Sequence, residues 1–514
     1  MDAASAGIHG NLLARPGRVL LDDLSRVRGA LEEAFPIPSA HKRSLPDAVR
    51  ELSRLLTLER AELKLPYWAA PRFLAAYIYY FLPWNIYRMA WLLPGLDLPL
   101  RPGAAILDVG SGPLTLPLAL WCARPDLRVL PLSFICGDTA VRPMEIGRDI
   151  FRRLAGKDSP WRIVLRREPL EKSLSASSRA EESGGMDCIM AGNVLNELPL
   201  AGEARPEREL TRLMALFAGR LVSGGRVLLV EPGTRLGGKL IALARRGALL
   251  RGLFPLAPCT HGAPCPMLGN SPHASAAGTP AEDRVARPQK AGAGGIRRLP
   301  FYSGWCHFVH PAGDAPQSLL ALSRKAQLEK TGLSVSCLLL QKPDRGAENP
   351  AGSARPLPSR GGFGQSPMSE PLSDVFFYGD DLEELDALHA YIMKEGSGGA
   401  SPPGKARPSA PAGTSGGKRI QCPAPDASLP AAGRMPLRVI SDRIRLTGEE
   451  EPGRYACCER GLALLRDAAR VPSGGIALAP LPEREERDSR SGALLLRCGG
   501  ASRIRRRSKV KASS

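Results

Sequence analysis

The sequence predicts an α/β fold in which a parallel, Rossmann-like sheet follows an N-terminal helical region and precedes a cysteine-rich C-terminal extension. Two observations lead to this prediction. The apolar run 106–109 passes directly into the turn Gly110-Ser111-Gly112, and two later runs, 187–193 and 224–233, have the composition of strands that end in polar residues. In open α/β sheets ligands bind beyond the carboxyl ends of the strands, so we expect one binding crevice there.

The glycine turn predicts the seat of a nucleotide-like cofactor. Glycine at Gly110 and Gly112 lets the backbone approach a ligand that a Cβ atom would repel. Asp108 ends the preceding strand, and Asp138 follows a second apolar run at the distance where a βαβ unit places a ribose-binding carboxylate. The third glycine of the dinucleotide fingerprint is missing, which favours S-adenosylmethionine over a dinucleotide. An ordinary α/β domain with glycine turns is the alternative.

Asn193 and Glu231 end the next two predicted strands, and we expect both to converge with Asp108 and Asp138. Asn193 would lie beside the path of a transferred methyl group, which makes it the candidate catalytic residue. The Asn/Asp-Pro-Pro-aromatic motif of enzymes that methylate amino groups is expected at this place. The segment 192–195 reads Gly-Asn-Val-Leu instead, which argues against methylation of a base amine.

The N-terminal part of the chain is predicted to be helical. Apolar side chains recur there at helical spacing, as in Leu20, Leu24, Val27 and Leu31. The apolar segment 68–93 contains Pro71, Arg72 and Pro83, so it predicts buried core helices rather than a membrane span. After the central sheet, residues 317–330 have the pattern of a helix and 333–340 that of a strand.

Several cysteines form a candidate metal site. Cys259 and Cys265 stand in a proline-flanked loop, Cys306 follows later, and a fourth thiolate could come from Cys457 or Cys458. Four thiolates can hold an iron–sulfur cluster or a tetrahedral zinc ion, and the spacing alone does not decide between them. Disulfides would suit an exported protein. The first ten residues show neither a signal peptide nor an Arg-rich transit peptide, which predicts a cytoplasmic location.

The net charge of +19 favours a polyanion as partner, because phosphate contacts release counterions and steer association. RNA is the expected polyanion, although an Arg-rich composition can also reflect the coding bias of a genome. The basic run 503–511 has the composition of a tail that binds nucleic-acid backbone without reading sequence. We expect a monomer with no membrane contact.

Taken together, these motifs resemble the Rsm-type family of small-ribosomal-subunit methyltransferase-like proteins of bacteria and mitochondria. The resemblance covers roughly residues 45–342 and 434–466, and it rests on the segments 77–85, 107–113, 193–198, 230–234, 259–266 and 305–308. It implies a class I S-adenosylmethionine-dependent methyltransferase fold and a [4Fe-4S] cluster. The implied ligands are Cys259, Cys265, Cys306 and Cys457, with zinc as the alternative metal. Leu114 departs from the family pattern, because the family turn often has a final glycine there.

Two functions follow from the resemblance. In the first, the protein is an enzyme that transfers a methyl group from S-adenosylmethionine to small-subunit ribosomal RNA, with Asp108, Gly110, Gly112, Asp138 and Asn193 at the cofactor. In the second, it is a non-catalytic factor that uses the fold to bind RNA during small-subunit assembly. The cysteine spacing Cys-x3-Cys-x2-Cys of radical S-adenosylmethionine enzymes is absent from the sequence.

Composition and motifs divide the chain into seven predicted segments. They are a flexible N-terminus (1–16), a helical region (17–98), the methyltransferase-like domain (99–256), the cysteine loop with its following helix and strand (257–342, with an insertion at 267–300), a mostly disordered linker (343–433), a small β unit (434–468) and a basic tail (469–514).

Overall fold

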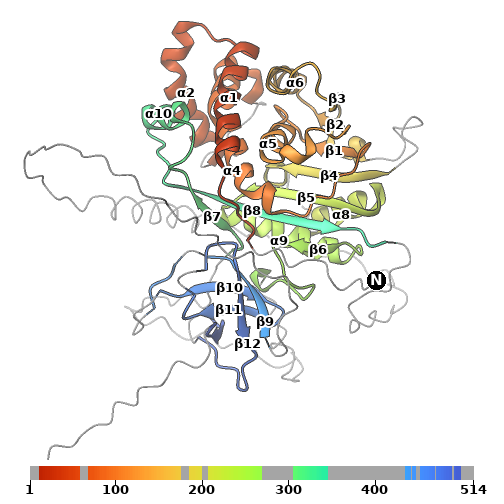
Figure 1. The fold of residues 1–514 in the computed structure, drawn as a ribbon, viewed down its shortest axis with the longest axis vertical. Coiled ribbons are helices and arrows are strands. Elements are labelled where there is room, and N and C mark those ends of the chain that lie inside the picture. Colours follow the sequence, from red (N-terminus) through yellow and green to blue (C-terminus); the bar gives the residue numbers. More distant parts are fainter. Residues whose placement is uncertain are drawn as a thin grey trace, which may run out of the picture.

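The computed structural model contains two sheets, a large one covered by helices and a small one beside it (Figure 1). It describes residues 11–57, 67–174, 185–198, 206–268, 305–344, 434–441, 443–446, 452–468, 471–488 and 491–498. Most of the predicted insertion at 267–300 and of the predicted linker at 343–433 therefore lies outside the described residues, as do 1–10 and the terminal basic run.

The N-terminal region is a group of helices that packs on the large sheet. It contains α1 (Arg18–Ala34), α2 (Ser39–Thr57), α3 (Pro71–Ala76), the π-helical turn η3 (Tyr77–Phe81) and α4 (Leu82–Leu92). Pro71 stands in the first turn of α3, where a missing backbone N–H removes no helical hydrogen bond. Pro83 directly follows the π-helical turn, which runs on into α4. In the described part of the chain, no helix has the length and apolar character needed to cross a membrane.

The large sheet has the strand order β3-β2-β1-β4-β5-β8-β6, and β7 pairs with β8. Its strands are β1 (Ala105–Val109), β2 (Ser133–Asp138), β3 (Arg162–Arg167), β4 (Met186–Gly192), β5 (Leu221–Pro232), β6 (Phe254–Ala257), β7 (Phe308–Pro311) and β8 (Gly332–Gln341). The first five strands in this order are parallel to one another, whereas β8 is antiparallel to both β5 and β6. An antiparallel strand thus stands between the fifth and sixth strands of an otherwise parallel sheet.

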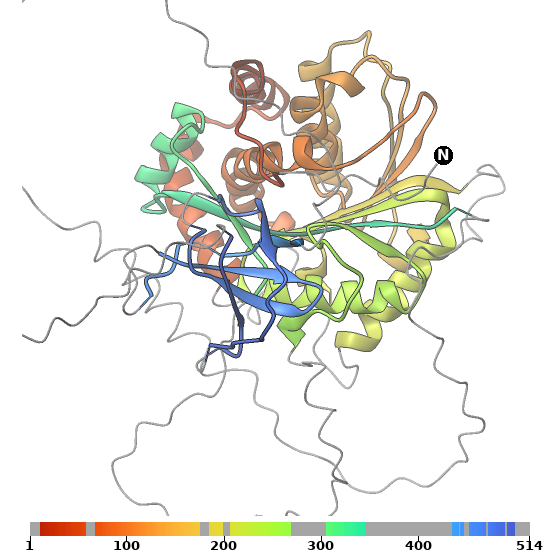
Figure 2. The same ribbon diagram turned by 60° about the horizontal axis from the view of Figure 1, so that its bottom comes forward.

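Helices cover both faces of this sheet (Figure 2). α5 (Thr115–Ala123) and α6 (Val141–Ala155) lie with α1 and α4 on one face, and α8 (Pro206–Arg220) and α9 (Arg235–Leu249) lie on the other. Alternate residues of each strand point to opposite faces, so Ile106 belongs to the first core and Leu107 to the second. The remaining short helices are α7 (Leu170–Leu174), α10 (Gln317–Lys325), η2 (Tyr67–Ala69), η4 (Leu93–Gly95), η5 (Pro125–Leu127), η7 (Leu195–Glu197) and η8 (Pro266–Leu268).

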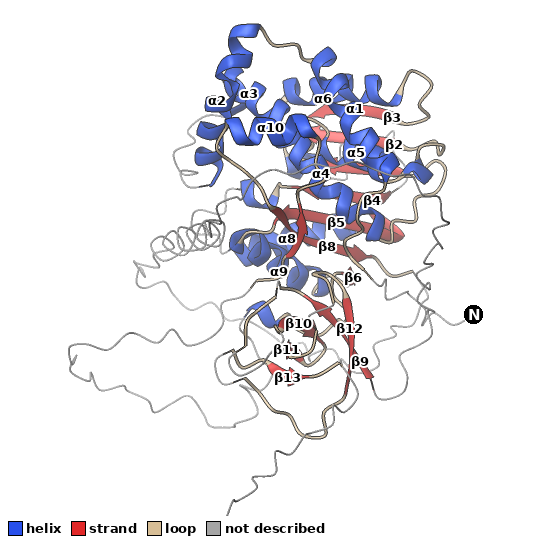
Figure 3. Cartoon of the chain, turned by 60° about the vertical axis from the view of Figure 1, so that its left-hand side comes forward, coloured by secondary structure: helices blue, strands red, loops and turns tan. Residues whose placement is uncertain are grey.

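The small sheet lies beside the β6 and α9 end of the large one (Figure 3). It consists of β9 (Arg434–Val439), β10 (Arg454–Cys458), β11 (Gly461–Leu465), β12 (Ile476–Pro480) and β13 (Leu494–Leu496), in the order β12-β9-β10-β11-β13. The pair β11 and β13 is parallel, and the other neighbours are antiparallel.

Two predicted boundaries were wrong. β12 and β13 lie within the segment 469–514 that was predicted to be a basic tail, so the β unit extends to Leu496 and not to 468. Both strands are short, and they are stabilised by pairing with β9 and β11 and by burial of side chains such as Ala479 and Leu494 in the core of the small sheet. The predicted flexible N-terminus is also too long: Leu12 is buried, and its N–H donates to the Gly474 carbonyl at 3.1 Å.

Candidate functional site

The carboxyl edge of the large sheet carries the predicted cofactor residues. Asp108 lies near the end of β1, Asp138 ends β2, Asn193 follows β4, and Glu231 lies near the end of β5. These strands are parallel neighbours, so their carboxyl ends meet at one edge. The structure therefore places these residues at the same edge, as expected from their positions after predicted strands.

Asp108 is a buried acid, and one of its carboxyl oxygens has no hydrogen-bond partner among the described residues. Its side chain is 2% exposed, and its Oδ2 has no hydrogen-bond partner among the described residues. Burial, helped by the nearby charge of Asp138, raises the pKa of Asp108 to about 8. The carboxyl group is therefore mostly protonated at neutral pH. A buried polar atom without a partner marks a place where a ligand can bind.

The glycine turn has a tighter packing than the sequence suggested. Gly110 and Gly112 have φ angles of +63° and +48°, which favour glycine. A Cβ atom on Gly110 would lie 2.5 Å from Cγ2 of Val194, so this glycine is needed for packing against Val194. Leu114 has a φ of +57°, a left-handed conformation that costs roughly 1–2 kcal/mol for a residue with a side chain. This conformation accounts for the glycine that the resembling family often has at that position.

Asp138 holds the turn together. Its Oδ2 accepts a 2.9 Å hydrogen bond from the Gly112 N–H, and its Oδ1 accepts a 2.8 Å bond from the Ala140 N–H. The carboxylate therefore links the turn after β1 to the start of α6. Each carboxylate oxygen has a second lone pair, so the predicted contact with ribose hydroxyls would add to these bonds.

Asn193 and Glu231 shape the loop after β4. Asn193 has a φ of +59°, and its Oδ1 is buried without a hydrogen-bond partner in the described part of the chain. Glu231 is fully buried, and its Oε1 accepts a 2.8 Å hydrogen bond from the Leu195 N–H. Glu231 thus fixes the loop that carries Asn193, a positioning role that its place in the sequence did not reveal.

Aromatic side chains from the N-terminal region lie over the glycine turn. Trp68 is nearest, because a Cβ atom on Gly112 would be 3.7 Å from its ring. The ring of Tyr77 lies 4.5 Å from that of Trp68 and 5.7 Å from that of Tyr67, measured between centroids. The Tyr67 hydroxyl donates to Glu197 Oε1 at 3.5 Å. Sequence reasoning missed this cluster, although the segment 77–85 was one of the motifs behind the family resemblance.

The four predicted cysteine ligands gather where the two sheets meet. Burial raises the pKa of Cys306 well above its ordinary value, and the charges of Cys259, Cys265 and Cys457 raise it further. All four thiols therefore lie within range of one another's charge, and none forms a disulfide. Among the described residues, no three Cys, His or acidic side chains are close enough to hold a single metal ion.

The structure separates the two alternatives for the fourth cysteine. Cys457 and Cys458 are neighbours on β10, so their side chains point to opposite faces of the small sheet. Cys458 is buried in the interior of the β unit, with Ala456 and Leu465. Cys457 faces the cysteine loop, where its Sγ lies 3.2 Å from Nε2 of His261. Cys457 is therefore the member of the pair that shares a site with Cys259.

Arg245 places a buried positive charge against this site. It is 2% exposed and lies on α9. Its Nε donates to Cys259 Sγ at 3.1 Å, and its terminal nitrogen donates to the carbonyls of His261 and Ala263 at 2.8 and 2.7 Å. In the described part of the chain it forms no ion pair with a carboxylate. A buried guanidinium favours an anion beside it, and Cys259 Sγ is the ionisable group that it touches among the described residues.

Arg438 is a second buried guanidinium at the same junction. Its Nε donates to the Pro258 carbonyl at 2.9 Å, beside Cys259. Cys306 is held from the other side, because Ser336 Oγ donates to its carbonyl at 2.8 Å and Trp305 Nε1 donates to the Gly233 carbonyl at 2.8 Å. These contacts order the cysteine-bearing segments without using the thiols themselves.

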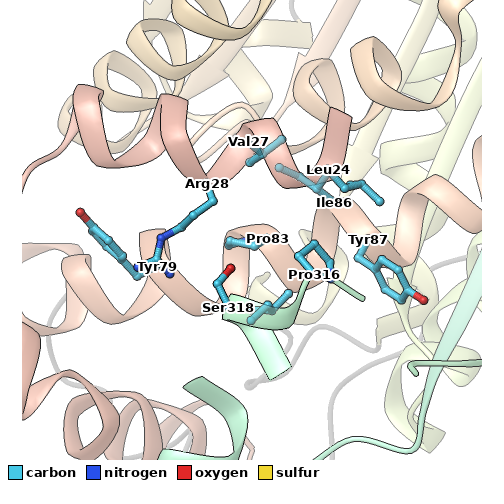
Figure 4. Close-up of a pocket in the computed structure, with 10 residues that line it drawn as sticks. Leu24, Val27, Arg28, Tyr79, Pro83, Ile86, Tyr87, Pro316 and Ser318 are labelled. Atoms are coloured by element: carbon cyan, nitrogen blue, oxygen red, sulfur yellow. The ribbon is translucent and has the colours of Figure 1, made fainter. Parts of the chain in front are cut away.

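Two hollows lie away from the predicted cofactor residues and from the cysteine site. The apolar space between α1, α4 and the start of α10 has a volume of about 20 Å³, room for no more than one water molecule (Figure 4). A wider hollow of about 460 Å³ is lined by residues 94–99 with Asn11, Ala14 and Arg124. Residues 94–99 precede β1, so this hollow lies at the amino edge of the sheet, opposite the unfilled polar atoms.

No protein-family model matches the sequence, and no curated protein is significantly similar to it. Solved structures with a similar arrangement include a methyltransferase from Pyrococcus furiosus, with 19% identity, a TM-score of 0.24, and coverage of 33% of this chain and 73% of that one. A precorrin-6y C5,15-methyltransferase from Geobacter metallireducens has 11% identity and a TM-score of 0.22 over 34% and 71% of the two chains. A protein assigned to the class I S-adenosylmethionine-dependent methyltransferases from Listeria monocytogenes has 10% identity and a TM-score of 0.29 over 65% and 90%.

The strand order and directions decide the fold. A parallel sheet that binds dinucleotides continues from its fifth strand to a parallel sixth. Here the antiparallel β8 is inserted between β5 and β6, and the glycine turn follows β1. The chain has the fold of class I S-adenosylmethionine-dependent methyltransferases.

Proposed function

We propose that this protein binds S-adenosylmethionine at the carboxyl edge of the large sheet and transfers its methyl group to RNA of the small ribosomal subunit. The observation that carries the cofactor proposal is the pair of buried, unfilled acceptor atoms there, Asp108 Oδ2 and Asn193 Oδ1. The cofactor supplies an ammonium group that can donate to such oxygens and a sulfonium methyl group for transfer.

The residues at this edge would act by orientation. Glu231 holds the loop after β4 through the Leu195 N–H, which fixes the place of Asn193. Asp138 holds the Gly112 N–H, which fixes the turn under the cofactor. A correctly placed acceptor needs little acid–base help in methyl transfer, because orientation supplies most of the acceleration. The aromatic cluster of Trp68 and Tyr77 lies beside the glycine turn, and we propose that unpaired bases of RNA stack on it.

Binding and transfer are tested separately. Calorimetry should detect S-adenosylmethionine binding to the wild-type protein and a weaker affinity for Asn193→Ala, which removes one of the two acceptor oxygens. Methyl transfer should then appear on small-subunit RNA or its precursor particles and not on large-subunit RNA. No binding by well-folded wild-type protein would contradict the cofactor proposal.

A second candidate is a non-catalytic factor for assembly of the small subunit. The observation that favours it is Val194, which occupies the place of the polar acceptor motif and packs against Gly110. Binding of S-adenosylmethionine without transfer to any assembly stage of the small subunit would support this candidate over the enzyme.

We further propose a [4Fe-4S] cluster on Cys259, Cys265, Cys306 and Cys457. The proposal is supported by the mutual electrostatic influence of the four thiols and by the buried Arg245 beside Cys259. Such a cluster binds each thiolate to a different iron, so it needs wider sulfur spacing than a single ion. When bound, it would connect segments that are far apart in the chain.

Protein purified without oxygen should contain iron and acid-labile sulfide in equal amounts, and Cys265→Ser should lose both. Stoichiometric zinc without sulfide would contradict the cluster and establish the alternative metal.

A further inference from the structure

The motif segment 77–85 has one polar side, of which the proposed function uses only the ring of Tyr77. Its residues Tyr80 and Trp84 turn toward the core, where they hydrogen-bond to the Leu328 carbonyl at 3.2 Å and to Ser323 Oγ at 3.2 Å. Tyr77 and Asn85 lie on the other side and hydrogen-bond to each other, and burial and the charge of Glu197 raise the pKa of Tyr77. This side therefore faces the loop after β4.

Arg88 continues this polar side one turn beyond Asn85. Its terminal nitrogen donates to Asn85 Oδ1 at 2.8 Å, and its Nε is buried without a hydrogen-bond partner among the described residues. It forms no ion pair in the described part of the chain. Burial lowers the pKa of Arg88 to about 10, while Tyr77 and Glu231 act in the opposite direction. The guanidinium thus remains charged at neutral pH, is partly buried, and has a buried Nε without a hydrogen-bond partner among the described residues.

Arg88 lies next to the end of β4. The adjacent Met89 touches that end, because a Cβ atom on Gly192 would be 3.1 Å from Met89 Cε. Asn193 follows Gly192, and Glu231 at the end of β5 is close enough to affect the pKa of Arg88. Among the described residues, Asp108 Oδ2 and Asn193 Oδ1 are buried acceptors without a hydrogen-bond partner at this edge, and Arg88 Nε is a buried cationic donor without one. The carboxylate of Glu231 is a further acidic group here, and it influences the charge of Arg88.

Asp108 Oδ2, Asn193 Oδ1 and Arg88 Nε match the methionine end of S-adenosylmethionine in hydrogen-bonding character. That end has one ammonium group, which donates hydrogen bonds, and one carboxylate, which accepts them. The adenosine part is uncharged and offers no partner of comparable strength for a partly buried guanidinium. Charge-assisted bonds between arginine and carboxylate are among the strongest hydrogen bonds in proteins.

We propose that Arg88 binds the methionine carboxylate of S-adenosylmethionine, opposite the Asp108 and Asn193 oxygens that receive the ammonium group. The proposal rests on the proposed binding of this cofactor, and it adds a residue that selects the ligand by its carboxylate. Asn85 is the positioning residue, since its Oδ1 holds one arm of the guanidinium.

The test compares S-adenosylmethionine with its decarboxylated form, which lacks only the carboxylate. The decarboxylated ligand should bind the wild-type protein about 10- to 100-fold more weakly, the range expected when a buried charged group loses its hydrogen-bonded partner. Arg88→Met should weaken S-adenosylmethionine by a similar factor while leaving the affinity for the decarboxylated form nearly unchanged. Arg88→Lys keeps the charge, so its affinity for S-adenosylmethionine should lie between those of the wild-type protein and Arg88→Met. Arg153→Met removes an exposed arginine on α6 and serves as the matched control that changes neither affinity.

Equal binding of the two ligands to wild-type protein would overturn the role of Arg88 and leave the cofactor proposal intact; this comparison needs no variant to fold. An equal loss of both ligands in Arg88→Met would also overturn it, because the residue would then act on the fold and not on the carboxylate. Weaker RNA binding with unchanged S-adenosylmethionine binding would overturn it in favour of an RNA phosphate as the anion. Failure of wild-type protein to bind S-adenosylmethionine at all would instead refute the proposed function.

Discussion

Binding of S-adenosylmethionine should release most of one proton from this protein at neutral pH. The source of the proton is Asp108, which is buried beside Asp138 and has a pKa raised to about 8. At about pH 7 a group with this pKa is about nine-tenths protonated. An ammonium group placed against the carboxyl group favours its charged form, so the proton leaves when the ligand binds. Asp108 should therefore release about 0.9 proton per ligand, less the roughly 0.1–0.2 proton that the ligand's own amino group takes up at this pH.

The direction of the pH dependence follows from the same pKa. Below about pH 8 the free protein holds a proton that the complex does not, so the affinity should rise by up to about tenfold per pH unit as the pH increases toward 8. Above that pH the gain should end, because Asp108 is already ionised. The ligand's own amino group, with an ordinary pKa of about 7.7–8.0, then begins to lose its proton.

Calorimetry in two buffers at the same pH measures this release, because phosphate and Tris take up protons with very different heats. The dependence of the observed heat on the buffer gives the number of protons released. Asp108→Asn should bind more weakly and should show almost no buffer dependence. Equal heats for the wild-type protein in both buffers would refute the reasoning, since Asp108 would then be ionised before the ligand arrives.

Three further predictions follow from the cysteine site and the charge. Cys457→Ala should lose the iron while Cys458→Ala keeps it, as measured by iron content after anaerobic purification, and retention by both would contradict the assignment of Cys457. If the proposed cluster is present, Arg245→Met should lower its reduction potential by at least about 40 mV, the one-electron equivalent of about 1 kcal/mol, because the change removes a positive charge and a hydrogen bond from Cys259. Arg245→Lys should restore part of the change, and identical potentials by redox titration would contradict this. Removal of residues 503–514 should weaken RNA binding and reduce its salt dependence without changing S-adenosylmethionine affinity, and an unchanged salt slope would show that the tail makes no phosphate contacts.

The local features of the fold could be predicted from the sequence. A run of apolar residues that ends in Asp108 and enters a glycine turn predicts a strand and its direction toward the ligand, because strand periodicity and turn preferences act over a few residues. The same reasoning placed the strand of β8 in the chain. It could not show that β8 runs antiparallel between β5 and β6. That arrangement depends on pairing with residues about 110 positions away on β5 and about 85 positions away on β6.

Only the tertiary structure decided which side chains share the site. Neighbouring residues of a strand face opposite ways, so the sequence shows that Cys457 and Cys458 diverge, but the docking of the small sheet on the cysteine loop decides which of them meets Cys259. Arg88 and Arg245 have no distinguishing sequence pattern, because each is one of many arginines in a basic chain. Their importance comes from burial next to groups on other elements, and burial of a charge depends on the packing of the whole molecule.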